Sequence, residues 1–366
     1  MRHRGPYKSA IPPAIATRPV DLPPQVLLEL DEASQELVRF DSQHDDAIGP
    51  LAALLLRSES AASSQIENLT SSARAIAMAS LGEESPPNAR LIVNNGRAMQ
   101  AAISLAGRLD EAAIIEMQAA LLGDSNPAAT GGWREQPVWI GGTGIGPHQA
   151  GFVPPRAQLV PKAMADLVEF MARDDLPVLV HAAIAHAQFE TIHPFIDGNG
   201  RTGRALLHAM LRSKGLLRNV TVPVSAGLLA DTGRYFASLT AYQQGNLEEI
   251  VLLVGEATFR GITEARWLLG RVTETLDEWR EHLVARQDAL SWRLLEELPR
   301  QPVLNTSVVE ERFNASNTAV RRALEQLEAA GILQEFTGKK RSRLWVARQI
   351  TDLLDEFANR ASRRSL

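Results

Sequence analysis

The stretch that decides the fold reads His193-Pro194-Phe195-Ile196-Asp197-Gly198-Asn199-Gly200-Arg201-Thr202-Gly203-Arg204. The residues before it, 178–192, are predicted to form a helix, and another helix is predicted over residues 202–214. A glycine-rich turn that leads into a helix directs backbone N–H groups at one point, where the helix dipole also favours an anion. The stretch therefore predicts an anion site between two helices.

The side chains of this stretch indicate which anion would bind. Glycines at 198 and 200 allow the backbone to approach a phosphate closely. Arg201 and Arg204 are three residues apart on the first helical turn, so both reach the same side. Two guanidinium groups together with backbone donors suit a polyphosphate chain better than a single carboxylate.

Two further side chains bring chemistry to such a site. Asp197 directly precedes the turn and is placed to hold a Mg²⁺ ion that bridges phosphate oxygens. His193 is the one side chain of the stretch suited to accept a proton near neutral pH. The residues alone therefore predict a metal–polyphosphate site with a base beside it.

Other sites with similar motifs are excluded by context. Residues 198–203 match G-x-G-x-x-G, but a dinucleotide site needs a preceding strand and an acidic residue about 20 positions later. Here a predicted helix precedes the motif and no carboxylate stands at 221–224. A Walker site is excluded because no Gly-Lys-Ser/Thr follows. His181, His186 and His193 are spaced by five and seven residues, which does not place all three on one helical face for zinc.

The stretch from His193 to Arg204 resembles the Fic signature, H-x-F-x-D/E-G-N-G-R-x-x-R, at all eight fixed positions. The resemblance implies a protein adenylyltransferase that moves AMP from ATP, with Mg²⁺, to a protein hydroxyl. It also implies a mainly α fold, with a Fic-type helical core and a small β-hairpin flap. Glycine at 200 favours nucleotidyl transfer, since a lysine stands there in related families that phosphorylate.

The resemblance implies a role for each residue of the signature. His193 would be the general base that deprotonates a Tyr, Ser or Thr hydroxyl, and Asp197 would ligate Mg²⁺. The residues implied to bind the nucleotide are Gly198, Asn199 and Gly200 as an anion hole, Arg201 at the β-phosphate, Arg204 at the γ-phosphate, and Thr202 and Gly203 between them.

Two neighbouring segments also resemble parts of that family. Residues 136–142 and 151–155 resemble the flap, so a target protein would dock on the 136–155 hairpin by strand addition. A plain surface hairpin stays open as the alternative. Tyr235, followed by Phe236, resembles the segment that lines the adenine pocket. A pair of core aromatic residues is the alternative there.

An inhibitory element is suggested near the N-terminus. Residues 63–68, Ser-Ser-Gln-Ile-Glu-Asn, resemble the motif S/T-x-x-x-E-G/N of an inhibitory helix, here predicted at about residues 60–80. Ser63 and Glu67 are four residues apart and share a helical face. The family role is a pair between Glu67 and Arg204 that removes the γ-phosphate's partner. The resemblance therefore implies autoinhibition.

The last part of the chain, residues 299–366, has a different pattern. Two short predicted helices, a turn and two strand-like runs indicate a winged helix-turn-helix domain. Its basic residues are Arg321, Arg322, Lys339, Lys340, Arg341, Arg343 and Arg348. Duplex DNA binding is one interpretation, and self-association or target docking is the other.

Composition sets the remaining expectations. We expect an N-terminal helical region at 1–110, a catalytic core at 111–270, a connector helix at 271–298 and the winged domain. The net charge of −5 argues against general nucleic-acid coating. The chain has no cysteine, which suits a reducing cytoplasm, and no apolar run approaches the roughly 20 residues of a membrane helix. Cytoplasmic location is therefore expected.

Several alternatives stay open at this point. One alternative is a DNA-binding regulator whose core senses nucleotide, and another is removal of AMP from a modified protein by the same site. The identity of the target and the oligomeric state, including a homodimer, are not determined by the sequence.

Overall fold

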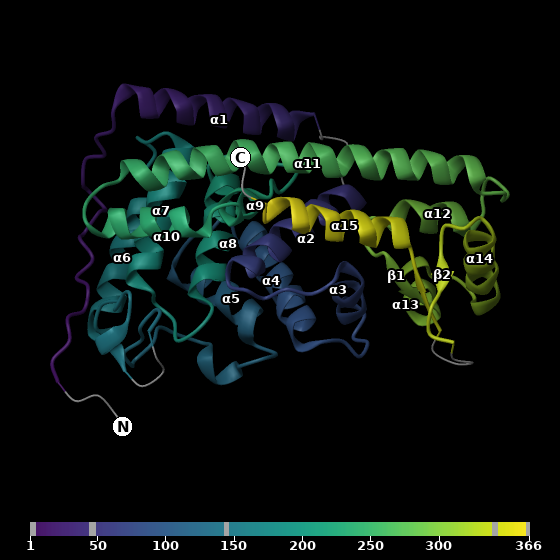
Figure 1. Cartoon of the computed structure of the whole chain (residues 1–366), viewed down its shortest axis with the longest axis horizontal. Helices are drawn as coiled ribbons and strands as arrows, with labels where there is room; N and C mark the ends of the chain where they lie inside the picture. Colours follow the sequence, from purple (N-terminus) through teal and green to yellow (C-terminus); the bar gives the residue numbers. More distant parts are fainter. Residues whose placement is uncertain (1–4, 44–48, 143–145, 339–342, 364–366) are drawn as a thin grey trace. The chain divides into compact units, whose positions relative to one another are not determined.

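The computed structural model describes residues 5–43, 49–142, 146–338 and 343–363, which form mostly helices and one small sheet (Figure 1). The chain divides into two compact units. The first contains Met1–Phe40, Asn94–Arg218 and Asp231–Phe259, and the second contains Asp41–Val93, Asn219–Ala230 and Arg260–Leu366.

The helices are α1 (Pro24–Ser42), α2 (Pro50–Ile66), α3 (Ala73–Ser80), α4 (Pro87–Ser104), α5 (Glu111–Leu122), α6 (Val160–Met171), α7 (Val178–Ile192), α8 (Asn199–Ser213), α9 (Val224–Leu229), α10 (Thr232–Gln243), α11 (Glu248–His282), α12 (Leu290–Glu297), α13 (Thr306–Phe313), α14 (Asn317–Ala329) and α15 (Arg348–Ala361). The strands are β1 (Val303–Asn305), β2 (Gln334–Glu335) and β3 (Leu344–Val346). Single 3-10 turns lie at η1 (Pro127–Ala129), η2 (Pro147–Gln149) and η3 (Ala157–Leu159).

Helix α7 is the centre of the first unit. Every residue from Leu179 to Ile192 is buried, which is the pattern of a helix that is covered all round. Helices α6, α8 and α10 pack against it, and α5 packs against α6 and α8. Because α7 is fixed on several sides, the residues at its C-terminal end are held in a defined position.

The loop that joins α7 to α8 begins and ends with a left-handed residue. His193 ends α7 with φ 49°, and Gly198 precedes α8 with φ 79°. Glycine adopts this conformation readily, but histidine does so at an energetic cost. A Cβ at position 198 would also lie only 2.7 Å from Cδ2 of Leu121. The loop therefore requires glycine at 198 for both its backbone conformation and its packing.

The second unit combines parts that are distant in sequence. Helix α2 packs against α9, and α15 packs against α2, α3 and α9. The sheet has the order β1-β3-β2, with antiparallel pairing of Val303 to Val346 and of Gln334 to Val346. Helices α12 and α13 both pack against α14.

Hydrogen bonds also join the C-terminal part of this unit to α3. The Nε2 group of Gln301 donates to the carbonyl oxygen of Ala77 (3.0 Å), and the N–H of Ala73 donates to the carboxylate of Asp355 (2.7 Å).

Three predicted elements differ in the structure. The helix predicted at about residues 60–80 is interrupted: α2 ends at Ile66, Asn68 is left-handed with φ 60°, and α3 starts after its N-cap Ser72. The predicted connector at 271–298 is divided, because residues 271–282 complete α11 and α12 begins only at Leu290. The predicted hairpin is held by one antiparallel bridge, between Ile140 and Phe152.

The N-terminal residues before α1 form an extended arm, as their proline content predicts. The arm is fixed to α6, because the N–H groups of Ile15 and Ala16 donate to the carboxylate of Asp166 at 2.7 and 3.3 Å. It is also fixed to α7, because Nε2 of Gln188 donates to the carbonyl oxygen of Pro13 (2.8 Å). Among the residues that the structure describes, no helix is long and apolar enough to cross a membrane.

Candidate active site

His193 lies where α7 ends. Its backbone N–H donates to the carbonyl oxygen of Phe189 (2.8 Å), which completes the last turn of the helix. Its left-handed backbone then turns the chain into the loop, and the side chain is half-buried. Non-glycine residues in this conformation are uncommon and occur often at active sites. The imidazole is therefore held at a helix end and not on a free surface loop.

The start of α8 provides the predicted anion site. Because the N–H of Thr202 is the first to donate within the helix, to Gly198 O (2.9 Å), the backbone N–H groups of residues 199–201 lie before the first intrahelical donor. Arg201 and Arg204 follow on the first turn, and both residues are buried, with 4% and 2% of their surface exposed. The N-terminus of this helix thus combines its dipole with two guanidinium groups.

Asn199 closes the loop. Its Oδ1 accepts from the N–H of Phe195 (2.8 Å), and its Nδ2 donates to the carbonyl oxygen of the same residue (2.9 Å). The amide side chain is therefore used within the loop, so that the part of Asn199 which faces an anion would be its backbone N–H. Phe195 is fully buried between Trp133 and Phe189, with ring centroids 5.2 and 6.2 Å away.

Asp197 is the exposed carboxylate of the loop. Its side chain is 53% exposed, with Oδ1 3.7 Å from NH2 of Arg201 and 2.6 Å from the N–H of Gly198. Among the described residues there is no group of three or more His, Cys, Asp or Glu that could hold a metal ion. One accessible carboxylate fits Mg²⁺ that is bound mainly through a substrate's phosphates, which is the usual manner for this ion.

Arg134 connects the loop to the flap segment, defined here as residues 136–155. Its Nε donates to the carbonyl oxygen of His193 (2.8 Å), and its NH2 donates to that of Pro155 (2.6 Å). NH1 donates to Gln136 O (3.1 Å), and the backbone N–H donates to Pro194 O (2.9 Å). Burial lowers the pKa of Arg134 below its ordinary value. This buried guanidinium therefore holds both ends of the flap against the residue that carries the imidazole.

Gln118 supports the loop from α5. Its Nε2 donates to the carbonyl oxygens of Ala129 (2.9 Å) and Asp197 (3.3 Å), and the residue has no exposed surface. Neither Arg134 nor Gln118 was predicted as a site residue. Their acceptors are backbone carbonyl groups that belong to other segments, which leave no mark in a sequence pattern.

The rest of the predicted nucleotide-binding stretch lies against α7. A Cβ at Gly203 would lie 2.6 Å from Oε1 of Glu190 and 2.9 Å from Cδ1 of Phe189. Thr202 is fully buried. Glycine at 203 therefore allows α8 to pack closely on α7, and a contact of these two residues with nucleotide stays a prediction.

Tyr235 lies in the core of the first unit. Only 1% of its surface is exposed, and its hydroxyl group is 2.8 Å from Nε2 of His186, which is fully buried on α7. Burial lowers the pKa of His186 to about 3. This geometry favours the alternative of a core aromatic residue, while the next residue, Phe236, is 51% exposed. Tyr235 therefore supports α7 from α10.

A hollow lies beside the loop. It has a volume of about 580 Å³ and is lined by residues 128–136 and by Ile196. Ile196 is exposed although its neighbour Phe195 is fully buried. The hollow offers space for a bound chain next to the exposed side of the loop.

The proposed inhibitory residues lie at the end of α2. Ser63 is fully buried, and Glu67 follows the last residue of the helix, with its N–H donating to Ser64 O (3.0 Å). Both belong to the second unit, whereas Arg204 belongs to the first. The pairing of Glu67 with Arg204 stays a prediction.

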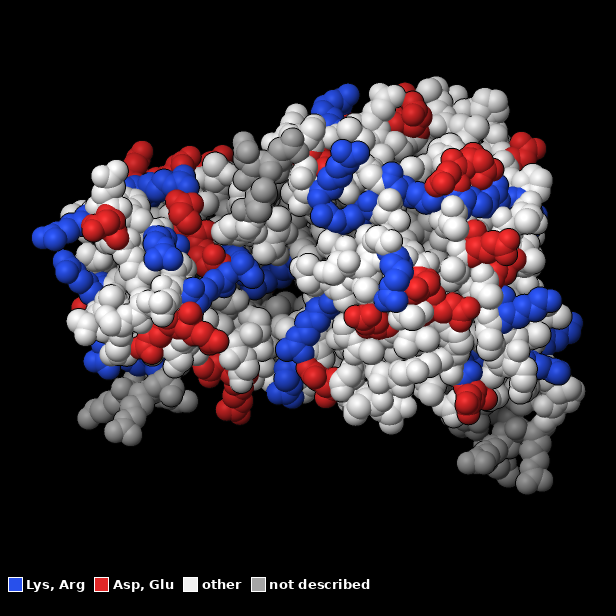
Figure 2. All heavy atoms as spheres, turned by 180° about the vertical axis from the view of Figure 1, so that it is seen from behind, with Lys and Arg blue, Asp and Glu red and all other residues white. Residues whose placement is uncertain are grey.

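The basic residues of the C-terminal segment are only partly described. Arg321 and Arg322 are exposed on α14, and Arg343 lies over the ring of Trp345, 4.9 Å from its centroid. Lys339, Lys340 and Arg341 lie outside the described residues. In Figure 2, basic and acidic side chains are interspersed over the face that is shown.

The fold and the loop define the class of the protein: a mainly helical domain in which a histidine precedes a glycine-rich turn and the N-terminus of a helix. Residues 108–211 match the model of the Fic/DOC family. The chain therefore carries a Fic domain over these residues.

Curated relatives match part of the chain. Protein adenylyltransferase fic-1 of Caenorhabditis briggsae is 31% identical over 146 residues, which are 39% of this chain and 26% of that protein. A probable protein adenylyltransferase of Aquifex aeolicus is 44% identical over 69 residues, or 19% of this chain and 22% of that protein. The matched segments thus span about a quarter of these relatives' length.

A solved structure is similar over most of the chain. A Fic family protein from Desulfovibrio desulfuricans G20 aligns with 90% of this chain and 97% of its own, with a TM-score of 0.58 and 21% identity. This similarity shows a shared fold.

Proposed function

We propose that the protein transfers AMP from ATP to a hydroxyl group of a protein. The observation that carries the proposal is the short loop closed by Asn199, which joins the end of α7, with His193, to the N-terminus of α8, with Arg201. A base and a polyphosphate site are thereby held within one rigid turn. The names of the curated relatives, which are adenylyltransferases, support the same reaction.

In the proposed reaction, His193 accepts the proton of the target hydroxyl as its oxygen attacks the α-phosphorus of ATP. The bond from that phosphorus to the β-phosphate oxygen breaks, and pyrophosphate leaves. The N–H groups at the start of α8 and the guanidinium of Arg201 face the negative charge that develops on the phosphates. Bound Mg²⁺, held by Asp197 together with the phosphates, would neutralise part of that charge.

The experiment that tests the proposal uses two labels. The chain and its Glu67→Gly variant are incubated with a host-cell lysate and either α-labelled or γ-labelled ATP. AMP transfer places label on protein only from α-labelled ATP. Label from γ-labelled ATP would instead show phosphorylation, and label from neither would reject transfer.

We further propose that Glu67 inhibits the site by pairing with Arg204. The motif at the end of α2 supports this, because Glu67 is the C-cap residue of α2 and the last turns of that helix are buried. Replacing Glu67 by glycine is then expected to increase transfer at least tenfold, as measured with α-labelled ATP. Equal rates in the two proteins would reject inhibition by Glu67.

The C-terminal segment is proposed to be a winged helix-turn-helix. The order β1, α13, α14, β2, β3 and the antiparallel sheet support this, and α14 presents Arg321 and Arg322 to solvent. If the segment binds duplex DNA, replacing both arginines by glutamine should weaken binding and lower its salt dependence. Fluorescence anisotropy at several salt concentrations tests this, and no binding at low salt would leave self-association or target docking as its role.

A further inference from the structure

The N-terminal arm continues beyond its anchors and reaches the flap segment. Residues 13–16 of the arm are fixed to α6 and α7 by the bonds to Asp166 and Gln188. Further out, the N–H of Ala10 donates to the carbonyl oxygen of Val153 (2.9 Å). At the outermost described residue, Nε2 of His148 donates to the carbonyl oxygen of Gly5 (3.0 Å). The arm therefore touches the flap at two places.

The bond to Val153 has the geometry of an added strand. Ile140 and Phe152 exchange both of their backbone hydrogen bonds, at 2.9 and 3.2 Å. Because polar groups alternate in direction along an extended chain, the carbonyl group of Val153 points to the opposite edge. Ala10 binds at that outer edge. The arm thus occupies the position that a third strand would take.

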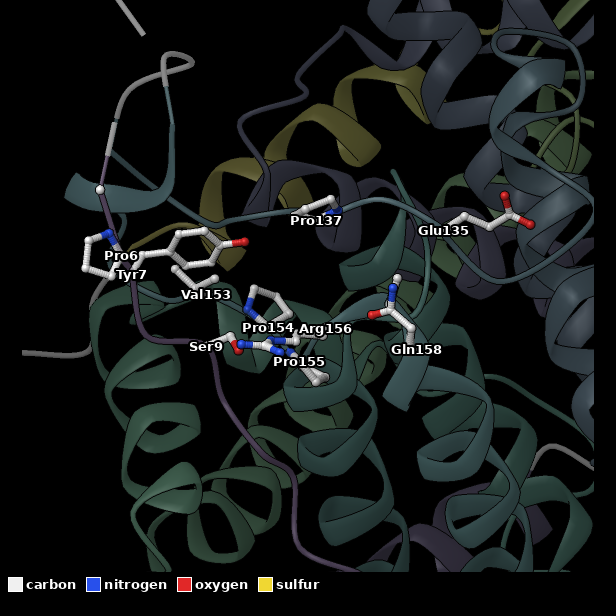
Figure 3. A pocket seen from close by; sticks show the side chains of 12 residues that line it. Pro6, Tyr7, Ser9, Glu135, Pro137, Val153, Pro154, Pro155, Arg156 and Gln158 are labelled. Carbon is white, nitrogen blue, oxygen red and sulfur yellow. The ribbon is translucent and has the colours of Figure 1, made fainter. Parts of the chain in front are cut away.

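The other contacts between the outer part of the arm and the flap are weak. Figure 3 shows a cavity, of about 390 Å³, that is lined by residues of both the arm and the flap, among them Tyr7, Ser9 and Val153. The ring of Tyr7 meets that of His148 edge-on, with centroids 6.0 Å apart, yet the residue is 43% exposed. Among the described residues, the contacts of this part of the arm include one main-chain bond to Val153, the contact with His148 and a half-exposed aromatic ring. It is therefore far less firmly held than residues 13–16.

One side chain, that of Arg134, links the wall of the cavity to the candidate active site. Pro155 lines the cavity, and its carbonyl oxygen accepts from the same guanidinium, of Arg134, that donates to the carbonyl oxygen of His193. A chain bound at the outer edge of the flap therefore lies one side chain away from the backbone of the proposed base.

We propose that the outer edge of the flap at Val153 binds an extended peptide, and that residues 5–10 of the same chain fill it at rest. A segment of the target protein must then displace the arm. The arm also defines what the edge recognises: a residue with a free N–H at the position of Ala10 and an aromatic residue three positions earlier, at that of Tyr7. The effect of the arm on AMP transfer rests on the proposed function, whereas the binding of a peptide at this edge does not.

The binding is tested without any transfer reaction. The probe is a fluorescein-labelled peptide with the sequence of residues 5–12, added to the full chain and followed by anisotropy. In the wild-type chain the arm competes at the high effective concentration of a tethered segment. Ala10→Pro removes the single ladder N–H, so the probe should bind roughly three- to tenfold more tightly to this variant.

The matched control is Ile11→Pro, whose N–H points away from Val153 in an extended arm. The Ile11→Pro variant should bind the probe no more tightly than the wild-type chain does. A probe with proline in place of Ala10 should fail to bind the Ala10→Pro chain. Equal binding to both variants, or undiminished binding of the proline probe, would overturn the proposal.

A second measurement separates this inference from the proposed function. In the Glu67→Gly background, Ala10→Pro should raise kcat/KM for a peptide target several-fold and leave the KM for ATP unchanged. If the probe binds as expected but no AMP is transferred, the docking edge stands and the proposed function fails. If AMP is transferred but Ala10→Pro slows it relative to Ile11→Pro, the arm supports the flap and does not compete.

Discussion

His186 shows what complete burial does to a side chain of α7. Its pKa in the folded chain is about 3, against an ordinary value of 6.5, because burial disfavours the charged imidazolium. Between about pH 6.5 and pH 3, His186 is protonated in the unfolded chain but stays neutral in the folded chain. The free energy of unfolding should therefore decrease as the pH falls through this window, by up to about 1.4 kcal/mol per pH unit.

Urea unfolding at pH 7, 6 and 5 measures this slope. The variant His186→Gln should show a smaller slope than the wild-type chain. Identical slopes in the two proteins would mean that His186 is not buried as a neutral ring.

Arg134 is expected to matter for both stability and activity. Arg134→Ala would leave the carbonyl groups of His193, Pro155 and Gln136 without this donor. Buried acceptors that lose a partner destabilise a protein, here by on the order of 3 kcal/mol in total. AMP transfer should fall by at least tenfold, because the loop and the flap are no longer held together.

Urea unfolding and α-labelled ATP measure the two effects, with Arg108→Ala as the exposed control. Guanidinium ion added at millimolar concentration should restore part of the activity of Arg134→Ala. A variant as stable and as active as the wild-type chain would contradict this role.

The sequence is informative about residues whose chemistry lies in their own segment. The stretch from His193 to Arg204 is such a case, because one glycine turn and its flanking side chains form a site locally. Arg134 and Gln118 were missed because each acts on backbone carbonyl groups far away in the chain. For Tyr235, the aromatic side chain alone did not distinguish a pocket wall from the core, and its burial against His186 favours the core.

At the scale of elements, the close contact of α7 with α8 depends on the absence of a side chain at Gly203. Gly203→Ala should destabilise the protein by about 1–3 kcal/mol, because the new Cβ would overlap Glu190 and Phe189. Gly270→Ala is the matched control: it is exposed on α11 and no atom lies within 4 Å of the added Cβ. It should stabilise the chain by about 0.5–1 kcal/mol through helix propensity. Thermal unfolding measures the change in stability of each variant. If Gly203→Ala stabilised the protein, α8 would not pack on α7 as closely as described.

The helices themselves were largely predictable, whereas their ends were less so. The run of helix-forming residues at 178–192 marks α7 with the correct ends. The break between α2 and α3 was missed, although the sequence carries its signals. Asn68 tolerates the left-handed conformation, and Ser72 accepts from the N–H of Ala75 as an N-cap (3.3 Å). These signals were outweighed by a run of good helix formers on both sides.

At the scale of the whole molecule, the compact units combine segments that are far apart in the chain. The second unit contains both α2–α3 and the C-terminal segment, whereas the sequence analysis placed these in separate regions. Composition and linkers reveal boundaries along a chain, but they carry no information about which distant segments pack together. The pairing of Ala73 with Asp355 is an example.

Helix α15 should consequently be required for the second unit. Ending the chain after Ala347 removes four large buried apolar side chains, Ile350, Leu353, Leu354 and Phe357. At roughly 1.5–3 kcal/mol each, their loss should destabilise the unit by more than about 5 kcal/mol. Limited proteolysis should then cut within residues 67–72, whereas the exposed substitution Glu356→Gln should change nothing. A truncated chain as resistant as the full one would show that α15 is dispensable.

The most direct test of the account compares Glu67→Gly with Glu67→Gly/His193→Ala for transfer from α-labelled ATP and for ATP binding. The double variant should bind ATP about as well as the single variant but transfer AMP about 10²–10⁴-fold more slowly, since only the proton acceptor is lost. Equal transfer rates in the two proteins, or no ATP binding by either, would contradict a nucleotide site with His193 as its base.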